Sequence, residues 1–362
     1  MTDHPPPLPL GHRLRARGAA RNATGRFEPA TREAFADDWD IPEDDRLIRT
    51  ETRLERPRSA ITYNRSPDLP FDRSINPYRG CEHGCVYCYA RPSHAFLNLS
   101  PGLDFETRLI ARPGIAAILA QELARPSYKV APIAIGTNTD PYQPIDAQHG
   151  LMRQILMVLA DHNHPVWITT RGTLIERDID LIAAMAANRL ASVSISLTTL
   201  DATLARKMEP RAPSPKRRLA VIRALSAAGI PVRVQVSPLI PALTDHELEV
   251  ILEAAAGAGA SHATSILLRL PQEVATLFRD WIETTFPGSA ARVMGRVREL
   301  HGGRDYDPSF GTRTAGQGLW ADLHKRRLAV ARKRLGLERG LPDLRSDLFR
   351  VPPKAGDQLT LF

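Results

Sequence analysis

Six times between residues 74 and 285, a short strand-like run is followed by a longer amphipathic stretch. The short runs predict β-strands at residues 74–78, 132–135, 166–170, 191–198, 232–236 and 264–268. The longer stretches predict helices at residues 115–123, 147–159, 176–187, 215–228, 245–256 and 273–285. Because strands that alternate with helices of this length form parallel sheets with right-handed crossovers, the sequence predicts an α/β fold. Six units indicate a partial (β/α)6 TIM-like barrel instead of a closed barrel of eight units.

The chain outside these units has a different character. Residues 1–58 are rich in Pro, Arg, Asp and Ala without periodicity, which predicts an irregular N-terminal segment before a barrel at residues 59–287. Residues 288–340 predict a basic helical C-terminal extension. Four of its basic residues share one helical face: Lys325, Arg326, Arg332 and Lys333. Residues 341–362 are interrupted by Pro and predict a flexible tail.

Charge and hydropathy limit the partners and the compartment. The chain has 48 Lys and Arg against 40 Asp and Glu, a formal net charge of +8, which favours a polyanionic partner such as nucleic acid. No apolar run approaches the roughly 20 residues of a membrane span. The N-terminus lacks the apolar region of a secretory signal. We therefore expect a cytoplasmic protein with no membrane partner.

The three cysteines of the chain stand within eight residues, as Cys81, Cys85 and Cys88, in the spacing CxxxCxxC. Three cysteines cannot all pair as disulfides, and a reducing compartment keeps them as thiols. Because thiolates are the ligands of iron–sulfur clusters, this compact loop predicts a [4Fe–4S] cluster with three Cys ligands and one open iron. Gly80 and Gly84 permit the tight backbone that such a loop needs. The alternatives are three reduced core thiols or a zinc site, but zinc prefers four ligands, commonly in C-x2-C pairs, and only one such pair is present.

The motif CxxxCxxC after the first strand of a six-unit barrel resembles the radical S-adenosylmethionine superfamily. Within it, the segment NPYRGCEHGCVYCYARPSHAFLNLSPGLDFETRL is similar to the spore photoproduct lyase-like branch, known as DNA repair photolyase-like proteins. The resemblance covers about residues 60–290. It implies that the open iron binds S-adenosyl-L-methionine, and that an electron from a reductant such as flavodoxin or ferredoxin passes through the cluster. The cofactor is then cleaved to methionine and a 5′-deoxyadenosyl radical, which abstracts a hydrogen atom from the substrate.

The resemblance also implies cofactor-binding residues at the strand ends. Tyr87 stands where the family uses an aromatic residue whose backbone contacts the adenine. Thr139, after the second strand, matches a position that holds the amino acid group, and Arg171, after the third, can pair with its carboxylate. Ser196 ends the fourth strand, where the family reaches the ribose. Each position also has a structural alternative, because polar strand ends are common without function.

The chain departs from the branch at Thr137. Spore photoproduct lyase resemblance predicts a hydrogen-donating cysteine there, and all three cysteines of this chain are assigned to the cluster. A hydroxyl is a poor replacement, because its O–H bond is much stronger than S–H. The lyase's own repair mechanism is therefore doubtful here. Tyr89 and Tyr142 are the alternative donors that the sequence offers.

A basic segment at residues 206–218 follows the fourth strand, and it would lie on the catalytic rim of the barrel. Its positive residues predict contacts with the phosphates of a nucleic acid: Arg206, Lys207, Arg211, Lys216, Arg217 and Arg218. The alternative is a solvated loop in which Glu209 pairs with Arg218.

The chain ends in the sequence QLTLF, which is close to the peptide by which bacterial repair proteins bind the sliding clamp. The anchoring residues of such a peptide would be Gln358, Leu359, Leu361 and Phe362. The alternative is a hydrophobic terminus that packs on its own barrel.

Together these features predict a radical S-adenosylmethionine enzyme that abstracts a hydrogen atom from nucleic acid, in DNA repair or modification. A second hypothesis keeps the chemistry and changes the substrate to RNA or a protein side chain. A third is a non-catalytic iron–sulfur protein, a DNA-associated sensor or electron carrier. A zinc-binding adaptor is the fourth.

Overall fold

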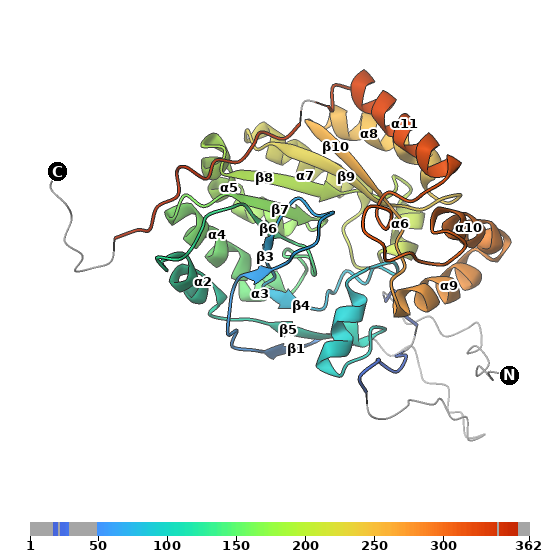
Figure 1. Ribbon diagram of the computed structural model, residues 1–362, viewed down its shortest axis with the longest axis horizontal. Coiled ribbons are helices and arrows are strands. Elements are labelled where there is room, and N and C mark those ends of the chain that lie inside the picture. The colour runs from blue at the N-terminus through green and yellow to red at the C-terminus, as the bar shows by residue number, and fades with distance from the viewer. Residues whose placement is uncertain (1–16, 21, 29–48, 339, 354–362) are drawn as a thin grey trace.

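The computed structural model describes residues 17–20, 22–28, 49–338 and 340–353 (Figure 1). Its main sheet has seven strands in the order β10-β9-β8-β7-β6-β3-β2. Their bounds are β2 (Thr62–Tyr63), β3 (Arg73–Ile75), β6 (Ile133–Ile135), β7 (Val166–Thr170), β8 (Ala191–Ser196), β9 (Val232–Leu239) and β10 (His262–Leu267). β2 pairs antiparallel with β3, and the other five pairs are parallel. The six parallel strands confirm the predicted α/β fold of six units. β10 and β2 form the two ends of the strand order, so the sheet is a partial barrel.

Helices follow the parallel strands as the sequence predicts. Their bounds are α2 (Ile115–Leu123), α4 (Leu151–Asp161), α5 (Ile179–Ala187), α7 (Pro215–Ala227), α8 (Leu248–Gly257) and α9 (Glu273–Thr285). Short 3-10 turns η2 (Leu174–Asp178) and η3 (Asp245–Glu247) lead into α5 and α8. The helix predicted over residues 147–159 is split, because Gly150 has a φ of +58° and ends the short helix α3 (Asp146–His149) before α4 begins.

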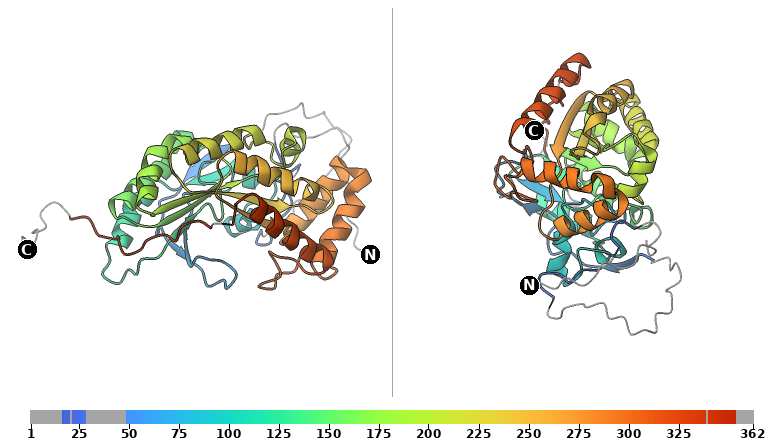
Figure 2. Two further views of the ribbon diagram at one scale, coloured as in Figure 1. Left: turned by 90° about the horizontal axis from the view of Figure 1, so that it is seen from above. Right: turned by 90° about the vertical axis from the view of Figure 1, so that its right-hand side faces the viewer.

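The core lies between the sheet and the helices on its outer face, which Figure 2 shows as the green and yellow layer above the strands. In β7 and β9, buried residues alternate with half-buried ones, so one side of each strand packs on this layer and the other faces the barrel interior. Local signals fix the helix ends. In α7, Ser214 accepts a hydrogen bond from the Arg217 N–H and Pro215 opens the first turn.

A second, small sheet lies beside the cysteine loop. It consists of β1 (Glu51–Leu54), β5 (Arg108–Ala111) and β4 (Tyr78–Arg79), with β5 in the middle. The strand predicted at residues 74–78 is thus divided between two sheets, since Pro77 lacks the N–H that a continuous ladder needs. β1 is a short strand within residues 1–58, which the sequence predicts to be mostly irregular, and it forms by pairing with β5, more than fifty residues away.

Two further helices follow α9, namely α10 (Pro287–Leu300) and α11 (Leu319–Arg334). α10 packs on α9, while Leu328 and Ala331 of α11, with Leu335 directly after it, pack against the main core. The remaining short elements, η1 (Arg91–Leu97), α1 (Asp104–Thr107) and α6 (Ala202–Met208), surround the cysteine loop. No helix among the described residues is both long and apolar enough to cross a bilayer.

The described part of the predicted tail, residues 341–353, corrects the prediction of a flexible segment. The ring of Phe349 lies 5.7 Å from that of Tyr128 and 5.6 Å from that of His164. The Arg350 N–H donates to the His162 carbonyl at 3.0 Å. Figure 1 shows this segment running from α11 past α5 toward α4. Its Pro content predicts flexibility, but the ring contacts of the half-buried Phe349 and backbone hydrogen bonds hold it on the barrel.

Burial of His164 makes the stability of the fold depend on pH. Its Nδ1–H donates to the Pro165 carbonyl at 3.0 Å, and its Nε2 lies 2.7 Å from the Tyr128 hydroxyl. Desolvation, with the positive charge of Arg73, lowers the pKa of His164 to about 4. Between pH 6.5 and pH 4, His164 is protonated in the unfolded state but stays mostly neutral in the folded state. The free energy of unfolding therefore falls as the pH drops through this range. We expect His164 to contribute about 2 kcal/mol of this loss at pH 5.

Chemical denaturation of wild type and His164→Asn at pH 7 and pH 5 measures this contribution. The variant starts less stable but loses less on acidification. An equal loss in both proteins would show that another group controls the effect.

Candidate active site at the cysteine loop

The cysteine loop, residues 81–88, lies between β4 and η1 and is fixed by backbone hydrogen bonds to several neighbours. The Cys81 N–H donates to the Phe105 carbonyl at 2.9 Å, and the Val86 N–H donates to the Met208 carbonyl at 3.0 Å. The segments that follow β6, β7 and β8 meet the same loop. Of the predicted site residues, Arg171 contacts the thiol of Cys85 and Thr139 contacts the Gly80 carbonyl beside the loop, as expected for the carboxyl ends of parallel strands, while Ser196 contacts Arg218.

All three thiols are free; Cys81 and Cys85 are buried, and Cys88 is half-buried. Burial raises the pKa of Cys81 well above its ordinary value and that of Cys85 to about 12, and the sulfurs lie near enough for each charge to affect the others. Within the described chain, no three His, Cys, Asp or Glu side chains already converge on a point that a metal ion could occupy. The donor set nevertheless fits an iron–sulfur cluster, because one short loop carries three unpaired thiols and bound iron deprotonates a coordinating thiol.

Two glycines let the loop approach its surroundings closely. Gly80 and Gly84 have φ values of +75° and +66°. A Cβ on Gly84 would stand 2.7 Å from a carboxylate oxygen of Glu106, and one on Gly80 would stand 2.8 Å from the Phe105 carbonyl oxygen. The backbone could not hold this position with larger residues.

Beneath the loop lies Arg91, a residue that the sequence reading missed. Its guanidinium is fully buried, donates to the Cys85 carbonyl at 3.0 Å and to the Gly102 carbonyl at 2.9 Å, and pairs with the buried Glu106. Glu106 in turn accepts hydrogen bonds from the N–H groups of Gly18 and Ala19, both at 2.9 Å. An arginine next to a proline near the cysteine motif carries no signal for this role, because the sequence does not show that Arg91 and Glu106 are buried together.

Arg171 reaches the cysteine loop from the end of β7. Its Nη1 lies 3.0 Å from Sγ of Cys85, 2.8 Å from the Tyr87 hydroxyl and 2.7 Å from Oε1 of Glu209. Glu209 also accepts hydrogen bonds from Tyr87, from Arg218 and from Thr198, the last at 2.9 Å. Burial opposes the charge of Glu209, but Arg218 and Arg171 outweigh it and hold the pKa of this carboxyl at about 2. The predicted partner of the cofactor's carboxylate therefore already has a carboxylate beside it.

Asp140 joins the segment after β6 to the segment after β7. It accepts hydrogen bonds from the Thr170 hydroxyl at 2.6 Å and from the Arg171 N–H at 2.8 Å, and it lies 3.4 Å from Nδ1 of His83. Burial opposes its charge, but His83 and these donors hold the pKa of Asp140 at about 2. The carboxylate thus fixes the backbone of Arg171 relative to the cysteine loop.

The other predicted cofactor residues are buried and engaged. The Thr139 hydroxyl donates to the Gly80 carbonyl at 2.6 Å. The Ser196 carbonyl accepts a hydrogen bond from Arg218 at 3.2 Å, and the Tyr87 hydroxyl donates to Glu209. Their roles toward the adenine, amino acid group and ribose stay predictions.

Of the two tyrosines that the sequence offers as hydrogen donors, only Tyr89 lies open at the site. It is 47% exposed, its hydroxyl donates to the Thr137 carbonyl, and Arg269 lies 4.6 Å from the centre of its ring. Tyr142 is buried in the core and donates to Asp178 at 3.1 Å.

The basic segment at residues 206–218 divides into inward and outward cations. Arg218 is 1% exposed and pairs with Glu209, so its prediction as a phosphate contact is wrong. The alternative is correct in pairing these two residues, but the pair is buried and does not lie in a solvated loop. Arg211 is half-buried and pairs with Glu82 at 3.0 Å. The outward residues are Arg206, Lys207, Lys216 and Arg217. Glu209, the one acidic residue of this segment, was the sequence feature that could have indicated a buried ion pair with one of its cations.

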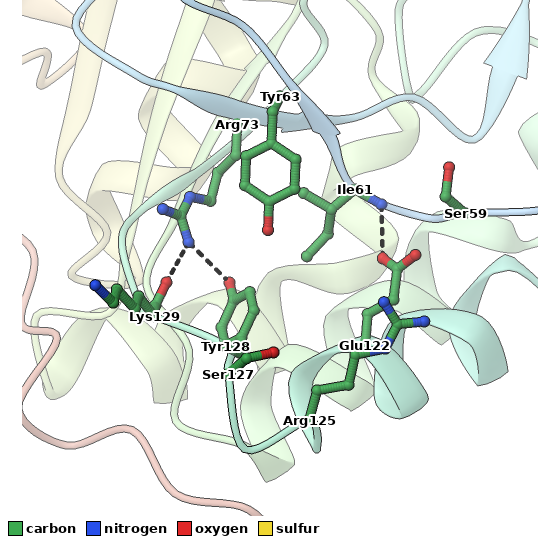
Figure 3. Close-up of a pocket in the computed structure, with 9 residues that line it drawn as sticks. All are labelled: Ser59, Ile61, Tyr63, Arg73, Glu122, Arg125, Ser127, Tyr128 and Lys129. Carbon is green, nitrogen blue, oxygen red and sulfur yellow. Dashed lines mark hydrogen bonds between the residues drawn. The ribbon is translucent and has the colours of Figure 1, made fainter.

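A cavity of about 470 Å³ lies elsewhere, at the start of β3, whereas the thiols follow the end of that strand. Figure 3 shows Arg73 lying along its wall between Tyr63 and Tyr128, with its guanidinium donating to the Lys129 carbonyl. No cysteine and none of the predicted cofactor residues lines it. Gln358, Leu359, Leu361 and Phe362 lie outside the described residues, so the clamp peptide stays a prediction.

Comparison with known proteins assigns the chain to a family. A family model described as the radical SAM superfamily matches residues 75–255. Uncharacterized proteins of Mycobacterium tuberculosis and Mycobacterium bovis are 41% identical over 242 residues, which is 66% of this chain and 70% of theirs. An uncharacterized protein of Methanocaldococcus jannaschii is 27% identical over 173 residues, covering 48% of this chain and 62% of its own.

Solved structures show the same fold. A mutant of spore photoproduct lyase matches with a TM-score of 0.57 at 16% identity, over 78% of this chain and 79% of the lyase. Spore photoproduct lyase complexed with dinucleoside spore photoproduct matches with a TM-score of 0.57 at 15% identity and the same coverage. The chain therefore belongs to the radical S-adenosylmethionine superfamily, enzymes whose cofactors are a [4Fe–4S] cluster and S-adenosylmethionine.

Proposed function

We propose that this radical S-adenosylmethionine enzyme abstracts a hydrogen atom from a nucleic acid, with DNA as the substrate. The observation that carries the proposal is the group of outward cations after β8, Arg206, Lys207, Lys216 and Arg217, at the same ends of the strands as the thiols. Phosphates of a strand held there would bring a nucleotide over the cysteine loop. The fold shared with a lyase that was solved with a dinucleoside photoproduct supports the same substrate class.

The residues of the loop and strand ends would hold the cofactors. Cys81, Cys85 and Cys88 would bind the cluster, and the segments containing Thr139 and Ser196 would hold S-adenosylmethionine. When bound, the two cofactors together supply a radical that abstracts hydrogen from the substrate. The surrounding chain would orient the cofactor and exclude water, because most of these side chains are buried in the protein alone.

A transfer experiment identifies the substrate class. The anaerobically loaded enzyme receives S-adenosylmethionine, a reductant, and one of three deuterated fractions: damaged DNA, RNA or protein. We expect deuterium to appear in 5′-deoxyadenosine only with DNA, because the abstracted atom comes from the substrate. Transfer from RNA or protein alone would replace DNA with that substrate and contradict the proposal.

Charge reversal tests the binding surface. Arg206→Glu and Lys216→Glu, separately and together, should weaken binding of a labelled oligonucleotide. The slope of the logarithm of the binding constant against the logarithm of salt concentration should become shallower by about one for each cation lost. Lys325→Glu and Arg326→Glu on α11 change the same charge away from the thiols and serve as matched controls. Equal effects of the two pairs would show non-specific attraction by the basic protein.

We further propose that Tyr89 gives its hydroxyl hydrogen atom to the product radical, since Thr137 stands where the branch is expected to have a cysteine. The tyrosyl radical that this leaves would return to tyrosine by taking an electron from the reductant and a proton from solvent. The exposure of Tyr89 at the mouth of the site supports this role. Tyr89→Phe should retain cofactor cleavage and lose most substrate turnover, with Tyr63→Phe as a control for an exposed tyrosine elsewhere on the protein. Normal turnover in Tyr89→Phe would exclude the role.

A further inference from the structure

Arg171 contacts the cysteine loop through the sulfur of Cys85, and no function has been assigned to this contact. Arg171 Nη1 lies 3.0 Å from Sγ of Cys85, while the side chain is only 17% exposed. Its guanidinium carbon lies 5.9 Å from the centre of the Tyr87 ring, and its backbone N–H is held by Asp140. The guanidinium therefore has a defined position against a predicted ligand of the cluster.

Glu209 determines that position. This carboxylate is fully buried and lies between two arginines, with Oε1 2.7 Å from Arg171 Nη1 and Oε2 paired with Arg218. Arg218 is itself fixed by the carbonyls of Pro213 at 2.9 Å and Ser196 at 3.2 Å. A long arginine side chain is otherwise free to adopt many rotamers, so these contacts select the one that points at Cys85.

A hydrogen-bond donor that carries positive charge beside a ligand sulfur stabilises the reduced cluster, which is the more negative state. Hydrogen bonds to the sulfurs and net charge are among the factors that set the reduction potential of iron–sulfur clusters. We propose that Glu209 is a positioning residue that holds Arg171 against Sγ of Cys85, and that this contact raises the reduction potential of the cluster. The proposal rests on membership in the superfamily and is independent of the substrate.

Two effects of Glu209 oppose each other, and this makes the proposal testable. Removal of its negative charge alone would favour the reduced cluster and raise the potential. Removal of its hold on Arg171 would release the donor from Cys85 and lower the potential. The sign of the change in reduction potential in a Glu209→Ala variant therefore shows whether Glu209 acts mainly through its own charge or by positioning Arg171.

The experiment is a redox titration of the anaerobically loaded full-length protein, followed by electron paramagnetic resonance of the reduced cluster. It is run without S-adenosylmethionine, so that any contact of Arg171 with the cofactor does not enter. We expect Arg171→Gln and Glu209→Ala each to lower the equilibrium ratio of reduced to oxidised cluster about tenfold, which is about 59 mV for one electron. Arg177→Gln, which removes an arginine that pairs with Asp146 and Asp178 and touches no cysteine, should leave the potential unchanged.

A raised or unchanged potential in Glu209→Ala, or an unchanged one in Arg171→Gln, overturns the proposal. If Glu209→Ala does not fold, since it leaves two buried arginines without their carboxylate, Thr198→Val takes its place. That variant removes one hydrogen bond to Glu209 and should lower the potential less, in the same direction. No shift in a fully loaded Thr198→Val protein would then decide against Glu209.

Discussion

Replacing any one of Cys81, Cys85 and Cys88 with alanine removes the cluster from the anaerobically purified protein. The three are the cysteines of the chain, so no other thiol can replace a lost ligand. We expect iron content to fall from about four atoms per chain to less than about one, together with loss of the brown colour. Formation of 5′-deoxyadenosine should fall to background in each variant.

The measurement is iron and sulfide analysis after reconstitution, with thermal unfolding as a check that each variant folds. Thr137→Ala, a small substitution at the same rim, is the matched control and should retain full iron. Full four-iron content in any single cysteine variant would contradict the ligand assignment.

Replacing Arg91 with methionine should destabilise the protein by about 3–5 kcal/mol, because it leaves the buried carboxylate of Glu106 without its cation. Arg91 and Glu106 are both fully buried, and Arg91 also holds carbonyls of the cysteine loop and of the segment before α1. The substitution also weakens the cysteine loop, since the Cys85 carbonyl loses its hydrogen-bond donor. Cluster loading should therefore decline as well.

Urea unfolding of the wild-type and variant proteins measures this effect. Arg296→Met breaks an exposed ion pair with Glu299 on α10 and should cost less than about 1 kcal/mol. A loss of that small size for Arg91→Met would show that the buried pair is not required, as some buried ion pairs can be replaced by apolar residues without loss.

Periodicity in the sequence was sufficient to predict the strands and helices of the barrel. The runs that form β7, β8 and β9 each predict a strand without reference to distant residues, although β8 ends earlier and β9 ends later than the sequence predicts. The sequence also predicts the cluster site at the cysteine loop, because spacing and residue type alone restrict what three thiols can bind. These features depend on local chemistry, which a sequence displays directly.

The parts that could not be predicted depend on contacts between distant residues. β1 is ordered by β5, and Phe349 by a group of aromatic residues near β7. Glu209 and Arg218 look like a charged surface loop until their burial is known, and Arg91 carries no pattern at all. Which charges pair inside a protein depends on the fold. Composition alone therefore predicts that such arginines lie on the surface.

Reductive cleavage of S-adenosylmethionine by the anaerobically reconstituted protein tests the enzymatic assignment most directly. With a strong reductant and no substrate, wild-type protein should produce 5′-deoxyadenosine and methionine in equal amounts, while the Cys85→Ala protein produces neither. An iron-loaded wild-type protein that leaves the cofactor intact under these conditions would contradict the assignment.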